Sequence, residues 1–148
     1  MYKMFINGEF TDALSGKTRE ILNPANGQVI AVVPDAQPED VERAVAAARA
    51  AFDHGPWRKS TALERQKLLL KLADAIRAKF DFLADLEVKD NGKPLREAQF
   101  DIDDAANCFE FYAGLATKIH GETMSVPANS FSYVVREPIG VRFRTDQM

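Results

Sequence analysis

The chain of 148 residues has few cysteines, no long apolar run and no excess of positive charge, features on which several classes of protein depend. Cys108 is its only cysteine, so no disulfide can form within the chain, and this usage fits the reducing cytoplasm, where we predict the protein to be located. The apolar runs are short, and none approaches the length needed to span a membrane. A net charge of -3 gives no reason to expect nucleic acid or an anionic membrane as a partner.

Histidine is also scarce, and a phosphate-binding glycine motif is absent. His54 and His120 lie far apart, each beside a glycine at an expected helix end, where a polar side chain can cap the last carbonyl groups. We predict capping for both rather than metal ligation, since two isolated histidines do not make a zinc site. No strand, glycine-rich loop and helix follow one another, so the sequence lacks the usual pattern for holding the phosphates of a nucleotide.

Turn residues divide the first third of the chain into two expected β-hairpins. Asn7-Gly8, a dipeptide suited to tight turns, separates residues 5–6 from Phe10. The turn-rich segment 23–27 separates a second pair of apolar runs, at residues 20–22 and 29–33.

Apolar residues at helical spacing then predict three helices. The first begins at Pro38 and ends before Gly55-Pro56. The second begins with a capping box between Thr61 and Glu64 and continues to a stop at residues 91–94. The third runs from Pro94 to about Lys118. The residues expected on the buried faces of the last two helices are Leu69, Leu72, Ala73, Ile76, Phe80, Leu83, Ala98, Ile102, Ala105, Phe109, Tyr112 and Ala116.

After Gly121 the pattern changes to two strands, predicted at residues 123–126 and 130–136 and joined by residues 127–129. The hairpins, three helices and terminal strand pair together predict an α/β fold class.

An ordered series of short motifs resembles the N-terminal part of the NAD(P)-dependent aldehyde dehydrogenase superfamily. Each motif is weak alone, but together they cover residues 1–141 in the family's order. Residues 120–123 and 130–135 are most similar to the branch that contains betaine aldehyde and other small-aldehyde dehydrogenases. The motifs are Phe5-Ile6-Asn7-Gly8-Glu9-Phe10, Asn23-Pro24-Ala25-Asn26-Gly27, Asp90-Asn91-Gly92-Lys93-Pro94, Tyr112-Ala113-Gly114 and Arg136-Glu137-Pro138-Ile139-Gly140-Val141.

The resemblance implies the N-terminal portion of the aldehyde dehydrogenase fold, with an incomplete Rossmann-like domain. Residues 1–120 would be a segment of the cofactor-binding domain, residues 121–141 the oligomerisation strands, and residues 142–148 a tail outside the family pattern. It also implies that the intact protein oxidises a small aldehyde to a carboxylic acid with NAD or NADP. Self-association through the terminal strands is expected.

In the family a cysteine thiolate attacks the aldehyde, an oxyanion hole stabilises the tetrahedral intermediate, and a glutamate activates the hydrolytic water. The resemblance places all of these groups, and the cofactor-binding turn, beyond Val141. We therefore expect no catalytic residue and no cofactor-binding residue in this chain, and no activity of the chain alone. The alternative is a non-catalytic interaction module that pairs with an intact homologue.

The codons of the last seven residues suggest why residues 142–148 depart from the family pattern. Reading the codons of residues 144–146 one nucleotide later can give Gly-Gln-Ile, which many relatives carry at this point. We hypothesise a frameshift, which sequencing of the locus would test.

Two sets of residues are candidates for a site. Cys108 is predicted to be a buried, inert thiol on the third helix, because it lies beside Ala105 and Phe109 and no base accompanies it. Asp101, with Asp103 and Asp104, is predicted to lie on a solvated helix face. By resemblance, Asp101 and the main-chain carbonyl of Leu22 could instead hold a structural monovalent cation.

Overall fold

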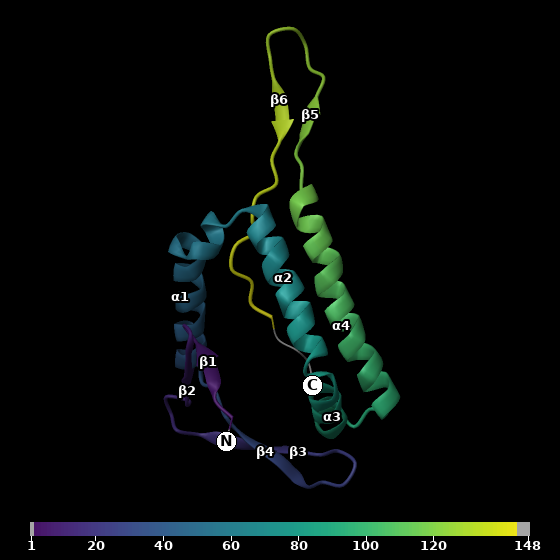
Figure 1. Cartoon of the computed structure of the whole chain (residues 1–148). Helices are drawn as coiled ribbons and strands as arrows, with labels where there is room; N and C mark the ends of the chain where they lie inside the picture. Colours follow the sequence, from purple (N-terminus) through teal and green to yellow (C-terminus); the bar gives the residue numbers. More distant parts are fainter. Residues whose placement is uncertain (1, 145–148) are drawn as a thin grey trace.

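A computed structural model describes residues 2–144 of the chain (Figure 1). Helices and strands both contribute, which confirms the α/β fold class. In chain order the elements are β1 (Met4–Ile6), β2 (Glu9–Thr11), β3 (Thr18–Leu22), β4 (Val29–Pro34), α1 (Pro38–His54), the 3-10 turn η1 (Pro56–Lys59), α2 (Ala62–Arg77), α3 (Phe80–Asn91), α4 (Leu95–Leu115), the 3-10 turn η2 (Ala116–Lys118), β5 (Glu122–Met124) and β6 (Ser132–Val134).

Both N-terminal hairpins form where the turn residues predicted them. β1 and β2 pair antiparallel with Phe5 opposite Phe10, and these two rings lie 5.2 Å apart. Asn7 and Gly8 both adopt the positive φ that a tight two-residue turn requires, at 54° and 84°. β3 and β4 also pair antiparallel, with an irregularity in register at Ile21 and Leu22.

The helices differ from the prediction at one point. The segment expected to be one helix from residue 61 to residue 91 is two helices, α2 and α3, so the described part of the chain has four α-helices rather than three. The backbone leaves the helical conformation at Lys79, whose φ is -114° and ψ 18°, and its N–H bonds to the carbonyl of Ile76. The apolar spacing misled because Ile76, Phe80 and Leu83 keep helical intervals across this short break.

The core is narrow and built from alanine. α2 and α4 lie side by side and run in opposite directions, with α3 at their lower end in Figure 1. The buried side chains of these three helices are Ala73, Ala84, Ala98, Ala106 and Ala113. Small side chains let the helix axes approach closely, but they bury little apolar area. The larger apolar side chains of the same helices therefore remain partly uncovered.

Two ion-pair groups link the helices. Arg77 on α2 donates to Glu110 on α4 at 2.5 Å and to the side-chain oxygen of Asn107 at 2.9 Å. Lys93, in the connection between α3 and α4, bonds to Glu87 at 2.7 Å and to Asp101.

Asp40 is the one large side chain that is fully buried in the described part of the chain, with 1% of its surface exposed. It lies in the first turn of α1, and its carboxylate accepts hydrogen bonds from the main-chain N–H groups of Leu14, at 3.1 Å, and Gln37, at 3.1 Å. Arg43 adds a third contact at 3.3 Å. Asp40 therefore ties the segment after the first hairpin to the start of α1.

β5 and β6 form the predicted terminal strand pair, although the paired segments are shorter than expected. They match three residues to three, with Thr123 opposite Tyr133. The ribbon projects beyond the ends of α2 and α4 and the chain then returns toward the helices (Figure 1). All three sheets of the described residues are two-stranded and antiparallel.

Candidate functional site

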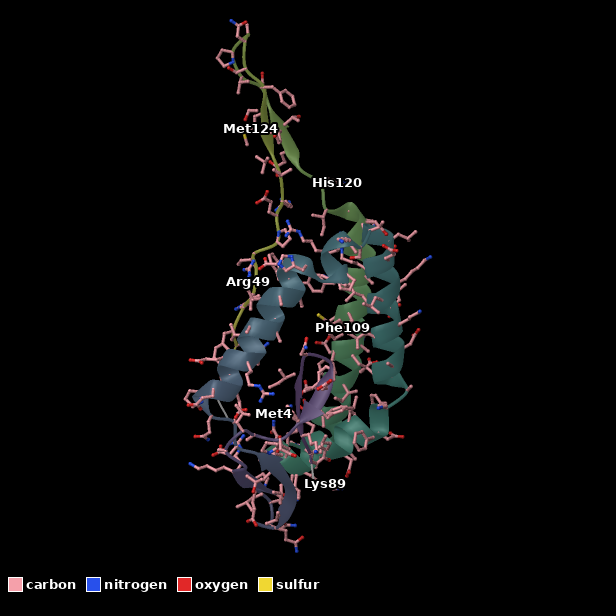
Figure 2. The ribbon with its side chains drawn as sticks, turned by 90° about the vertical axis from the view of Figure 1, so that its left-hand side faces the viewer. Met4, Arg49, Lys89, Phe109, His120 and Met124 are labelled. Atoms are coloured by element: carbon pink, nitrogen blue, oxygen red, sulfur yellow. The ribbon has the colours of Figure 1, made fainter. Side chains whose placement is uncertain are left out.

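The projecting ribbon, residues 121–136, is largely exposed, and we call it the arm. In Figure 2 it extends from His120 past Met124 and away from the helices. Phe131 and Tyr133 have 76% and 61% of their surface exposed, and their rings lie 5.7 Å apart. Because the arm has only two strands, each strand has an outer edge whose main-chain groups can pair with another strand.

The root of the arm is held by a small set of contacts. Arg136 Nε donates to the main-chain carbonyl of His120 at 3.2 Å, and its Nη2 lies 3.6 Å from Glu122 Oε1. Gly121 passes so close to β6 that a Cβ placed on it would lie 2.2 Å from the carbonyl oxygen of Val134. The segments that leave and re-enter the helical part therefore lie side by side at contact distance.

α2 and α4 also expose apolar side chains. Leu72 on α2 and Tyr112 on α4 were expected to be buried, but 41% and 57% of their surfaces are exposed. Ile102 and Phe109 are half-buried. The correction has a simple cause, since the described residues fold no further layer over these faces. They have the character of surfaces that another element or chain covers.

Cys108 is exposed, so the prediction that it is buried was wrong. Two residues rotate an α-helix by about 200°, which turns Cys108 away from the seam that Ala106 occupies. The neighbouring Ala105 and Phe109, on which the prediction rested, are themselves only half covered. Exposure alone does not make the thiol a nucleophile.

The two histidines do not come together. His54 is the last residue of α1, where a polar side chain suits the helix dipole, and His120 follows η2 at the root of the arm. Capping by their side chains stays a prediction. Between residues 2 and 144 no group of three or more His, Cys, Asp or Glu side chains could hold a metal ion.

Asp101 and Leu22, the predicted cation ligands, have different neighbours. The Asp101 carboxylate binds the Lys93 ammonium. This hydrogen bond raises the pKa of Lys93, and the hydrogen bond to Glu87 raises it by a smaller amount. Leu22 precedes the Asn23-Pro24 turn, and Pro24 packs against Gly92 at the end of α3, where an added Cβ would lie 2.8 Å from its Cγ. A cation site at these residues stays a prediction, with the Lys93 ammonium as competitor for Asp101.

Asp101, Asp103 and Asp104 are all exposed, as predicted for a solvated face. Sequence reasoning missed Asp40, Lys93, Gly121 and Arg136 as structurally important residues. Only Asp40 had a recognisable signal, because it stands three residues after Gln37 in a capping-box arrangement at the start of a helix.

The sheets between residues 2 and 144 are separate antiparallel ribbons, whereas a Rossmann-type dinucleotide site is built on adjacent parallel strands and a glycine turn that leads into a helix. The expectation that this chain holds no cofactor-binding residue stays a prediction. None of the helices described here is long and apolar enough to cross a membrane.

Comparisons with known proteins agree on one family. Residues 10–143 match the Aldehyde dehydrogenase family. The chain is 50% identical over 141 residues to aldehyde dehydrogenase family 2 member C4 of Arabidopsis thaliana, covering 94% of this chain and 28% of that protein. It is 48% identical over 139 residues to betaine aldehyde dehydrogenase of Bacillus subtilis (strain 168), covering 93% of this chain and 28% of the relative.

A solved structure shows the same arrangement. Betaine aldehyde dehydrogenase from Staphylococcus aureus, in complex with NAD+, matches with a TM-score of 0.82 and 42% identity, over 86% of this chain and 25% of that one. The matching part of such structures is their N-terminal portion. The chain thus spans about a quarter of the length of the relatives it matches.

Proposed function

Because this chain belongs to the aldehyde dehydrogenase family, we propose that it is the N-terminal part of an NAD(P)-dependent enzyme that oxidises a small aldehyde to a carboxylic acid. The observation that carries this proposal is the continuous match over residues 10–143. Bound NAD+ in the Staphylococcus aureus relative supports a nicotinamide cofactor for the whole protein. That cofactor would accept the hydride of the aldehyde.

The part played by these residues is structural. Residues 1–120 serve as the outer segment of the cofactor-binding domain, and residues 121–141, which include the arm, serve as the oligomerisation strands through which copies associate. The exposed edges and aromatic side chains of the arm support the second assignment. Of the proposed tail at residues 142–148, the last four lie outside the described residues.

The reacting groups belong to other parts of the whole enzyme. The separate antiparallel sheets of the described residues, and the exposed position of Cys108 on α4, support this assignment. What the chain supplies is the alanine-packed pair α2 and α4, their partly uncovered apolar faces, and the arm. The cytoplasmic location stays a prediction from the single cysteine.

Activity of the purified 148-residue chain tests the proposal. Mixed with small aldehydes and either NAD or NADP, it should produce no reduced cofactor, while an intact relative assayed in parallel does. Calorimetric titration with each cofactor should show no saturable heat, because too few contacts remain to hold a dinucleotide. Aldehyde-dependent reduction, or micromolar binding of either cofactor, would overturn the proposal.

The exposed arm favours a second candidate, a non-catalytic module that pairs with an intact homologue. Its outer edges are available for strand addition by another chain. Sedimentation of the chain mixed with an intact relative distinguishes the two. A mixed species supports the module, whereas self-association alone supports the dehydrogenase segment.

A further inference from the structure

We propose that the root of the arm is a directional lock, in which Gly121 permits the close approach of the two connecting segments and Arg136 ties them together. The inference rests on the proposed role of the arm in association, and it identifies what sets the direction in which the arm presents its edges. Gly121 and Arg136 act as positioning residues.

Glycine is required at position 121 because the main chain of Val134 lies very close to it. A Cβ at this position would lie 2.2 Å from the carbonyl oxygen of Val134 and 3.4 Å from its carbonyl carbon. Both atoms are main chain, so they cannot move aside as the end of a flexible side chain can. Val134 pairs with Glu122, the residue after Gly121, so a side chain here would force the strands apart at their first registered pair.

Arg136 ties the returning segment to the outgoing one. Its guanidinium contacts the residues on both sides of Gly121, the carbonyl of His120 at 3.2 Å and the carboxylate of Glu122 at 3.6 Å. The side chains of Arg136 and Glu122 are more than half exposed, so their ion pair is weak. The lock therefore depends on the hydrogen bond and the close approach together, and it can open.

Beyond its root, the arm is a two-stranded ribbon that joins no larger sheet in the described part of the chain. The strand pairing of β5 and β6 is with each other, and the arm extends beyond the ends of α2 and α4 (Figure 1). Its direction is consequently decided at the root. An arm held in one direction loses less conformational freedom when a partner strand binds, which favours association.

The chain offers a convenient measurement. Cys108 is its only cysteine and is exposed on α4. A second cysteine in the turn of the arm, Asn129→Cys, gives two positions for spin labels, and pulsed electron paramagnetic resonance then measures the distance between them. Doubly labelled chain is diluted into excess unlabelled chain, so that the signal comes from distances within one molecule. Circular dichroism checks the helical content of each variant.

The labelled parent should give one narrow distance distribution. Arg136→Gln should raise the population of other distances by about two- to fivefold, the range expected when a weak exposed pair is lost. Gly121→Ala should broaden the distribution further. The matched controls are Arg96→Gln, an exposed arginine at the far end of α4, and Gly114→Ala, where an added Cβ meets no atom within 4 Å. Both controls should leave the distribution narrow.

A parent distribution that is already broad would overturn the lock, as would Arg136→Gln and Gly121→Ala distributions as narrow as the parent. Sedimentation of the same variants separates this result from the proposed function. If the parent shows a narrow distribution that the root variants broaden but no copy associates, the lock holds and the associating role of the arm fails. If copies associate and the root variants change nothing, the lock fails alone.

Discussion

Removing the buried carboxylate of Asp40 should release the first hairpin from α1. In Asp40→Ala the main-chain N–H groups of Leu14 and Gln37 lose their acceptor, and Arg43 loses its partner. Hydrogen bonds to a charged group contribute roughly 1.5–3 kcal/mol each, and the half-exposed Arg43 adds little. Because released N–H groups near the surface regain water, we expect a loss of about 3 kcal/mol at this junction.

Amide hydrogen exchange measures that loss where it occurs. About 3 kcal/mol corresponds to a roughly 100-fold faster exchange of the Leu14 amide. Asp40→Asn keeps one acceptor oxygen and should give an intermediate rate. Glu42→Ala, an exposed acid on the same helix, is the control and should leave the Leu14 amide unchanged. Unchanged exchange of that amide in Asp40→Ala, with α1 still helical, would refute the reasoning.

Three further results follow from the structure. Tyr133→Lys should weaken self-association by up to about 3 kcal/mol per copy, because Tyr133 is 61% exposed and its ring offers roughly 120 Å² of apolar surface to a partner. Asn129→Lys, in the turn of the arm, should change the sedimentation profile little. The main-chain N–H and the hydroxyl of Thr61 donate hydrogen bonds to the Glu64 carboxylate, and these bonds lower the pKa of Glu64 below its ordinary 4.5. The stabilisation of α2 by this carboxylate is therefore complete above pH 4.5 and is lost as pH falls through the lowered pKa. Glu64→Gln should flatten this acid-induced loss of helical circular dichroism. Cys108→Ser, at an exposed position, should leave the melting temperature of the chain nearly unaltered. The same change in an intact relative should leave its turnover nearly unaltered. A large loss of turnover with retained folding would contradict the assignment of Cys108 as a non-catalytic thiol.

Local rules predicted the local elements. Asn7-Gly8 forms its turn, the Thr61 and Glu64 capping box is made in both directions, and Gly92 ends α3 in the left-handed conformation. These features depend on residues close in sequence, whose conformational preferences act without help from the rest of the fold. The motif order likewise predicted the family, which the comparisons confirm.

Burial was predicted less well, because the burial of a side chain depends on which other element packs against its helix face. The apolar spacing on α4 correctly placed Ala98 at the seam, but it also predicted cover for Tyr112 and Cys108, which are exposed. The spacing that continued across Lys79 hid a helix break, since periodicity cannot show a change of axis. Contacts between distant residues, such as Asp40 with Leu14, have no pattern in a single sequence.

The central claim is that these residues are an aldehyde dehydrogenase scaffold and arm, with the chemistry elsewhere. Turnover of a chimera tests it most directly, with residues 1–141 replacing the matching segment of Bacillus subtilis betaine aldehyde dehydrogenase, to which the chain is 48% identical. The account predicts a chimera that assembles as the parent does and oxidises betaine aldehyde within about tenfold of the parent rate, a difference of about 1.4 kcal/mol in the barrier. A chimera that folds and assembles but has no turnover would contradict it.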